Sequence, residues 1–130
     1  MKDLCPPGWP RPKGYSNAMA ARGRIVFTAG VIGWNEQQEF AEKTLAGQFA
    51  QTLRNILAIL ACDGADVRMI ARMTCYVTSI EEYRASLREI GTAWREIMGD
   101  HYPAMALVEV VRLVEPEAQI EIEATAVIPE

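Results

Sequence analysis

The chain has 130 residues, of which 50% are hydrophobic and 23% are charged, and its formal net charge is −4 at pH 7. This balance excludes a disordered chain and predicts one globular domain over residues 1–130. No apolar run reaches the roughly 18 residues that a membrane-spanning helix needs. No Lys/Arg-rich run stands out either, which disfavours nucleic acid as the main partner.

The cysteines and the N-terminal segment bear on where the protein works. Cys5, Cys62 and Cys75 are an odd count without the spacing of a metal site, so we expect free thiols and no bound metal. Residues 1–14 hold four prolines and two glycines, which predicts an extended N-terminal arm with Trp9 packed on the body. The segment lacks the continuous apolar core of a signal peptide, and we expect a cytoplasmic protein.

Two strands are expected next, a short edge strand over residues 15–21 and a second over residues 24–31, paired with each other across a turn. Residues 34–43 are polar and predict a loop. A helix then begins after Thr44, its expected N-cap, and ends near Gly64. Its buried face is predicted from apolar residues at helical spacing, which are Leu45, Phe49, Leu53, Ile56, Leu57 and Leu60.

A strand over residues 69–78 and a second helix follow. Cys75 is expected to be a buried small hydrophobic residue rather than a reactive thiol. Ser79 and Glu82 have the spacing of a capping box at the start of the helix. The only histidine, His101, is expected to make a loop contact rather than to act in catalysis. The helix should bury an apolar stripe made of Tyr83, Leu87, Ile90, Trp94 and Ile97 or Met98.

The last thirty residues predict two strands, 105–113 and 120–128, joined by a turn at residues 115–117. In the second strand apolar residues alternate with Glu121, Glu123, Thr125 and Val127, so one face should be buried. Met105, Leu107 and Glu109 are expected to share a sheet face with Glu121, where a site would lie.

These elements predict an α+β fold, with a mixed sheet and both helices packed on one of its faces. The other sheet face carries Val111, Val127 and further apolar residues, and nothing in the chain covers it. An exposed apolar face of this kind is typical of an interface, so we infer a homo-oligomer whose sheets pack face to face.

Motifs throughout the chain beyond the N-terminal arm resemble the RidA/YjgF family, the reactive intermediate deaminases, also labelled endoribonuclease L-PSP or translation inhibitor proteins. The segments that carry this resemblance are His101-Tyr102-Pro103-Ala104, Val108-Glu109-Val110-Val111-Arg112-Leu113, Ile120-Glu121-Ile122-Glu123-Ala124 with Ala126-Val127, Gly14-Tyr15, Val26-Phe27-Thr28-Ala29-Gly30 and Cys75-Tyr76-Val77-Thr78.

The resemblance implies a chorismate-mutase-like fold and a homotrimer whose sheets line a central barrel, with small-molecule ligands in three clefts between subunits. It also implies hydrolysis of enamines or imines released by pyridoxal-phosphate enzymes, without a metal or cofactor. In the family an arginine grips the substrate carboxylate, and a glutamate on the last strand, here Glu121, positions the attacking water. A tyrosine near the N-terminus, here Tyr15, shapes the cleft.

The chain departs from the family pattern at the arginine, which is Met105 here. Methionine has no hydrogen-bond donor, so the expected cleft has lost its anion anchor. Leu107 replaces the family's common cysteine, Ala29 its serine, and Leu87 its frequent asparagine. The expected cleft therefore has Glu121 as its catalytic residue and a substrate-binding wall made of Tyr15, Ala29, Gly30, Leu87, Met105, Leu107 and Arg112.

Three functions remain open at this point. A deaminase would act on a substrate that lacks the usual carboxylate, or on one held by Arg112 or Arg72. A non-catalytic ligand-binding or regulatory trimer would use the same cleft without hydrolysis. A ribonuclease or translation inhibitor ranks last because the chain is acidic. Glu121 could instead be a solvated or paired strand carboxylate, and Arg112 an ion-pair partner of a glutamate on a neighbouring strand.

Overall fold

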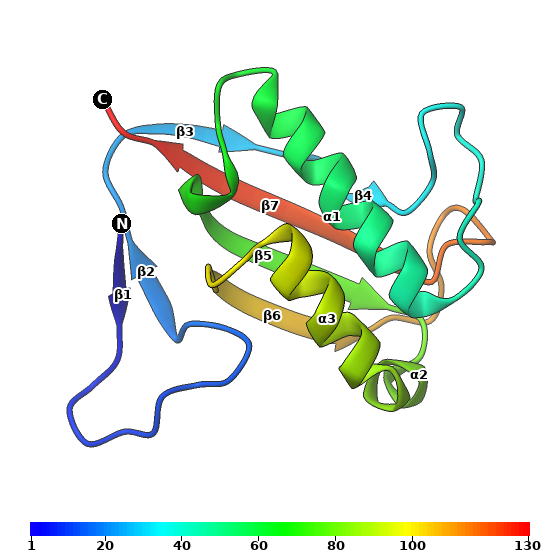
Figure 1. Ribbon diagram of the computed structural model, residues 1–130, viewed down its shortest axis with the longest axis horizontal. Coiled ribbons are helices and arrows are strands. Elements are labelled where there is room, and N and C mark those ends of the chain that lie inside the picture. The colour runs from blue at the N-terminus through cyan, green and yellow to red at the C-terminus, as the bar shows by residue number, and fades with distance from the viewer.

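The computed structural model describes residues 1–130, and its helices pack together against one sheet (Figure 1). In chain order the elements are β1 (Lys2–Leu4), β2 (Ala18–Ala20), β3 (Arg24–Phe27), β4 (Val31–Ile32), α1 (Leu45–Ala61), the 3₁₀ turn η1 (Val67–Met69), β5 (Ile70–Val77), α2 (Ile80–Ala85), α3 (Leu87–Ile97), β6 (Ala104–Glu109) and β7 (Ile120–Ile128).

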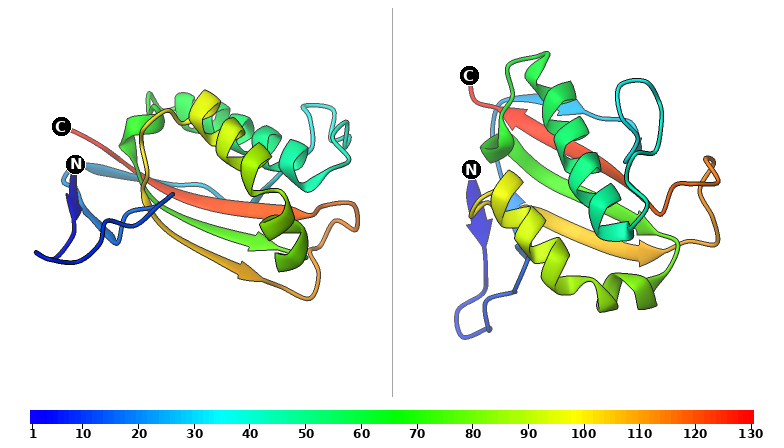
Figure 2. Two further views of the ribbon diagram at one scale, coloured as in Figure 1. Left: turned by 60° about the horizontal axis from the view of Figure 1, so that its bottom comes forward. Right: turned by 45° about the vertical axis from the view of Figure 1, so that its right-hand side comes forward.

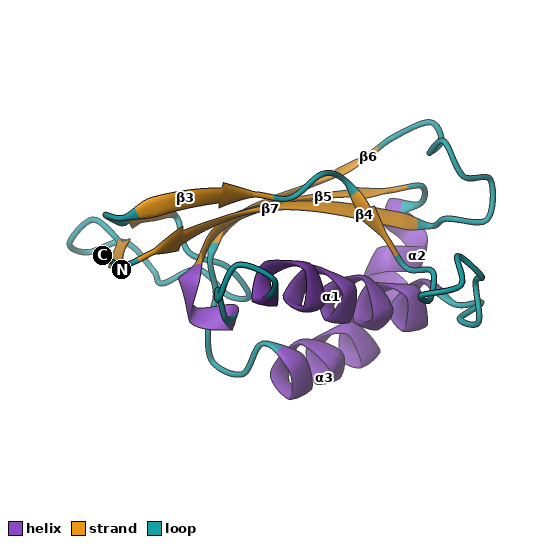
Figure 3. Ribbon diagram, turned by 90° about the horizontal axis from the view of Figure 1, so that it is seen from above, coloured by secondary structure: helices purple, strands orange, loops and turns teal.

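The main sheet has the strand order β3-β7-β5-β6, and the short β4 also pairs with β7. Strands β5 and β6 are parallel, whereas β7 runs antiparallel to β3 and β5. All helices lie on one face of this sheet (Figure 3). The predicted mixed α+β arrangement with helices on one face is therefore confirmed. We call the opposite face, which no element of the chain covers, the open face.

The N-terminal strands are arranged differently from the prediction. Strand β2 pairs with β1 in a separate two-stranded sheet beside one end of the main sheet (Figure 2), and β3 pairs with β7 instead. At Gly23, with φ 149°, the backbone lies directly against the Ile128 carbonyl at the end of β7. This close approach lies next to the first pair of the β3–β7 register, Arg24 with Ile128. Trp9 is 62% exposed, so the prediction that its ring packs on the body of the protein is wrong.

The second predicted helix is two helices. The Ser79 hydroxyl accepts a hydrogen bond from the Glu82 N–H, as expected of an N-cap. The chain then leaves helical geometry at Ser86, with φ −106° and ψ 12°, and α3 begins at Leu87. Leu87 is 53% exposed rather than buried. Ile90, Trp94 and Met98 are buried as predicted.

Strand β6 ends at Glu109, four residues before its predicted end. Glu109 is paired with Val77, the last residue of β5, so residues beyond it have no strand to pair with. Residues 110–119 form a loop instead, in which Val111 is 94% exposed. Val111 therefore does not lie on the sheet face where we expected it.

The core lies between the helices and the sheet. Along β7 the alternation is confirmed, because Ile120, Ile122, Ala124 and Ala126 are buried. On β5 a bulge between Ile70 and Arg72 interrupts the alternation of faces, so Ile70 is buried in the core together with Met73. The fully buried apolar side chains of α1 are Leu53, Ile56 and Leu60, and each contributes about 1.5–3 kcal/mol of hydrophobic stabilisation.

Cys75 belongs to this core. Its side chain is fully buried, and burial raises the pKa of its thiol to about 12. It is thus the inert small hydrophobic residue that the sequence predicted. None of the helices combines the length and the apolar character needed to cross a bilayer.

Candidate functional site

Glu121 lies on the open face, on the central strand β7, opposite Tyr76 of β5. Its carboxylate rests against Gly30, in the segment between β3 and β4. A Cβ atom at Gly30 would lie 2.7 Å from the Glu121 carboxyl carbon and closer still to Oε2, so only glycine leaves this space free. The half-buried Glu121 forms no ion pair. Two predicted site residues thus meet around an unpaired carboxylate.

Two other strand glutamates, Glu123 and Glu109, already accept hydrogen bonds within the chain. Glu123 accepts a 2.7 Å hydrogen bond from the Tyr76 hydroxyl, and Glu109 accepts a 3.0 Å hydrogen bond from the Ile80 N–H at the start of α2. The hydrogen bond to Glu123 is the largest cause of a raised Tyr76 pKa, followed by desolvation and by the charges of Glu123 and Glu121. Glu121 is therefore the β7 carboxylate that remains available for a ligand or a water.

Met105 and Leu107 lie on the opposite side of the sheet from Glu121. The parallel register places them beside Met73 and Cys75, which are buried under the helices. Glu121 is paired with Tyr76, the residue that follows Cys75 on β5. Because side chains alternate between faces along a strand, Tyr76 and Glu121 point away from the face of Cys75. The expectation that Met105, Leu107 and Glu109 share a sheet face with Glu121 is therefore wrong.

A cavity of about 330 Å³ lies between α3 and β6, and Met105, Leu107 and Leu87 line it. We call it the aromatic groove, because the rings of Phe49, Tyr83, Trp94 and Tyr102 also line it. Trp94 stacks on Tyr102 with ring centroids 5.7 Å apart and planes at 10°, and Phe49 lies 6.3 Å from Trp94.

Two cationic residues that line the aromatic groove were not predicted from the sequence. Arg95 of α3 and Lys13 of the N-terminal arm line the cavity together with its apolar residues. Arg95 directly follows Trp94 in the sequence. The apolar helix pattern singles out Trp94 as a buried residue but says nothing about the charged residue beside it. The proximity of Lys13 depends on the path of the irregular arm. No local sequence signal could have assigned either residue to this wall.

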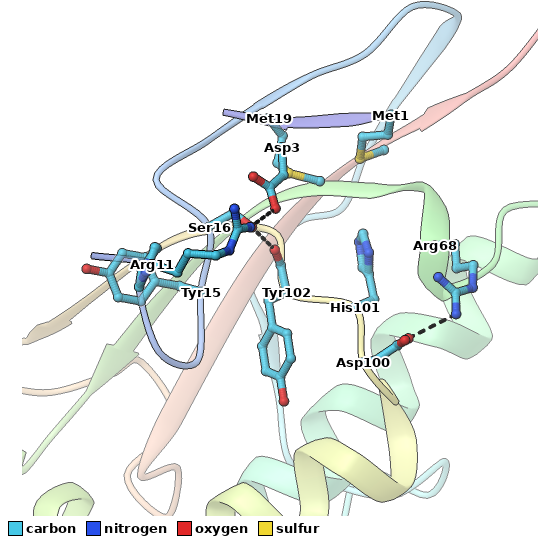
Figure 4. Close-up of a pocket in the computed structure, with 11 residues that line it drawn as sticks. Met1, Asp3, Arg11, Tyr15, Ser16, Met19, Arg68, Asp100, His101 and Tyr102 are labelled. Atoms are coloured by element: carbon cyan, nitrogen blue, oxygen red, sulfur yellow. Dashed lines mark hydrogen bonds and ion pairs between the residues drawn. The ribbon is translucent and has the colours of Figure 1, made fainter. Parts of the chain in front are cut away.

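Tyr15 lines a different, polar cavity of about 460 Å³. Figure 4 shows Tyr15 and Arg11 on one side of this pocket and Arg68 and Asp100 on the other. Arg68 forms a 2.9 Å ion pair with Asp100. His101 also lines the pocket, and its Nε2 is 2.7 Å from the Ile70 carbonyl oxygen, the loop contact that the sequence predicted.

Arg112 lies in the loop of residues 110–119, where it is exposed and forms no ion pair. It borders a shallow hollow with Val111 and Val114, so the interpretation as an ion-pair partner of a strand glutamate is wrong. Within one chain the predicted site residues lie in four places, which are the Ala29-Gly30-Glu121 cluster, the aromatic groove with Leu87, Met105 and Leu107, the polar pocket of Tyr15 and the loop of Arg112.

The family model described as Endoribonuclease L-PSP matches residues 10–128. The chain belongs to the RidA/YjgF family. A RutC family protein of Pyrococcus horikoshii is 34% identical over 119 residues, which are 90% of each chain. The 2-iminobutanoate/2-iminopropanoate deaminase of Escherichia coli is 30% identical over 108 residues, covering 81% of this chain and 80% of the relative.

RidA/YjgF membership extends to the three-dimensional structure. The crystal structure of the Rid family protein YyfB from Yersinia pestis superposes with a TM-score of 0.83, at 30% identity and over 98% of both chains. The mixed α+β fold is therefore that of a solved Rid protein. No group of three or more His, Cys, Asp or Glu side chains is placed to hold a metal ion.

Proposed function

We propose that the chain hydrolyses a small enamine or imine, with Glu121 as the residue that activates water. The observation that carries this proposal is the unpaired, half-buried carboxylate of Glu121, which rests on Gly30. The other open-face glutamate is hydrogen-bonded to Tyr76, whereas Glu121 can accept a proton from water. The similarity to a 2-iminobutanoate/2-iminopropanoate deaminase supports the same chemistry.

The reaction needs one general base and one water. Water attacks the carbon of the C=N bond, a C–O bond forms, and Glu121 takes a proton from the water oxygen. That proton passes to nitrogen and gives a carbinolamine. Its hydroxyl proton then also moves to nitrogen as the C–N bond breaks, and the products are a carbonyl compound and ammonia. An enamine first takes up a proton at carbon to become the imine. No redox step is involved.

We propose further that the working unit is a homotrimer with clefts between subunits. Ile25 and Phe27 of β3 and Val108 of β6 are 55%, 73% and 45% exposed, and β3 and β6 are the two edges of the main sheet. Exposed apolar side chains of this size favour an interface. Glu121 and Met105 lie on opposite faces of one sheet, so a cleft that uses both takes each from a different subunit.

Imine hydrolysis by four proteins tests the proposal. 2-Iminobutyrate is generated in situ with a dehydratase, and its loss is followed for the native chain, Glu121→Gln, Glu123→Gln and Met105→Arg. Glu123→Gln is the matched control, since Glu123 lies on the same strand and face but is bonded to Tyr76. Loss of the native activity by about 100-fold in Glu121→Gln alone supports the proposal. Equal rates in Glu121→Gln and the native chain would refute it.

A second candidate function, a non-catalytic ligand-binding trimer, is favoured by the apolar Met105 and Leu107 in the groove. It predicts no imine hydrolysis in any of the four proteins, together with saturable binding of a small molecule. Activity gained only in Met105→Arg would instead identify an intact water-activating half that acts on another substrate. Ribonuclease or translation-inhibitor activity ranks third, because the only histidine is held by the Ile70 carbonyl.

A further inference from the structure

The aromatic groove carries positive charge that no residue of the chain neutralises. Arg95 and Lys13 line it, and no acidic side chain does. Neither residue forms an ion pair. Four other cations do, namely Arg11, Arg24, Lys43 and Arg68. A ligand with a negative charge would therefore find two available cations at this cavity.

Arg95 lies along the wall of the groove, over a glycine of the same helix. Gly91 precedes it by four residues on α3 and also lines the cavity. A Cβ atom at Gly91 would lie 3.4 Å from Arg95 Nη1. The guanidinium group therefore lies back over Gly91, along the helix surface that borders the cavity. Met105 is across the groove on β6, the opposite wall.

The remainder of the groove suits an apolar body of limited size. The stacked rings of Trp94 and Tyr102 present flat apolar surfaces. Tyr83, half-buried, forms no side-chain hydrogen bond, and desolvation is the largest cause of its raised pKa, so its hydroxyl stays protonated and can donate to a ligand. A cavity of 330 Å³ is at the lower end of the roughly 300–1,000 Å³ of small-molecule sites.

We propose that the groove binds a small carboxylate with an aromatic or branched apolar body, and that Arg95, assisted by Lys13, holds the carboxylate from the α3 side. The apolar body lies against Met105, Leu107 and the aromatic rings. This inference rests on the proposed function for its reactive group, because the natural substrate would be an imine of such an acid. The missing arginine on β6 is thereby replaced by an anchor on the opposite wall.

Two matched probes test this anchor. 3-Phenylpropionate and 3-phenylpropionamide have the same shape and differ in charge, and their affinities are measured by calorimetry or NMR titration. The native chain should bind the acid about threefold to tenfold more tightly than the amide. Arg95→Gln should abolish most of this difference. Arg88→Gln should keep it, since Arg88 is exposed on the same helix but does not line the groove.

Equal affinities for acid and amide in the native chain would overturn the inference, as would an unchanged preference in Arg95→Gln. Propionate binding as tightly as 3-phenylpropionate would overturn the role of the apolar body. A charge preference without any imine hydrolysis would refute the proposed function alone, whereas hydrolysis without a charge preference would refute this inference alone.

Discussion

Gly30→Ala is a sharp test of Glu121, because it changes the position of the carboxylate without changing its chemistry. Gly30 has no positive φ, so alanine can adopt its backbone conformation. The added Cβ would lie 2.7 Å from the Glu121 carboxyl carbon, and real Cβ contacts are not shorter than 3.0 Å. The flexible carboxylate therefore has to move by at least a few tenths of an ångström. The free energy of unfolding should change by no more than about 1 kcal/mol.

Activity should respond far more strongly than stability. A misplacement of about 1 Å can cost on the order of 100-fold in rate, so we expect Gly30→Ala to lower imine hydrolysis by about tenfold to 100-fold. Gly30→Ala combined with Glu121→Gln should be no slower than Glu121→Gln alone, because both act through one carboxylate. Urea denaturation supplies the stability control. Full multiplicative losses in the double variant would refute the reasoning.

Three further predictions concern assembly, titration and capping. Phe27→Glu on the open face should dissociate the oligomer in sedimentation experiments, whereas Ile59→Glu, on the exposed side of α1, should not. Because burial raises the Cys75 pKa from 9.0 to about 12, its unfolded thiol ionises first as pH rises. The free energy of unfolding, measured by urea denaturation, should therefore fall above pH 9, by on the order of 1 kcal/mol per pH unit, and Cys75→Ala should lack this component. Thr44→Ala should lower the free energy of unfolding by about 1 kcal/mol in the same urea experiment, since the Thr44 hydroxyl accepts a hydrogen bond from the Gly47 N–H at the start of α1.

The sequence predicted which face of a strand is buried better than it predicted which strands pair with each other. Alternation along β7 depends only on local burial, so the inward positions of Ile120 and Ile122 were predictable. Which strand lies beside which depends on long-range pairing, and here β7 lies between β3 and β5. The pairing of β2 with β3 was accordingly wrong. The bulge after Ile70 also has no local signal, although it changes which β5 residues reach the core.

The candidate site shows the same limit. The contact between Glu121 and Gly30 joins residues that the family pattern singles out, whereas the opposite-face position of Met105 follows only from the register of β6 on β5. Arg95 was not expected because a charged residue beside a buried stripe is usually a solvated one. Its place in the groove depends on how α3 packs beside β6, which no local pattern predicts.

Mixing two inactive variants tests most directly whether the halves of the site meet between subunits. Glu121→Gln disables the carboxylate half, and Leu87→Glu places a negative charge at the exposed rim of the aromatic groove. We expect each cleft to join the open face of one subunit to the groove of the next. In an equal, random mixture about one quarter of the clefts then combine two intact halves, so the mixture should recover about one quarter of the native imine hydrolysis. Mixtures that stay as inactive as their parents would contradict this account of the site.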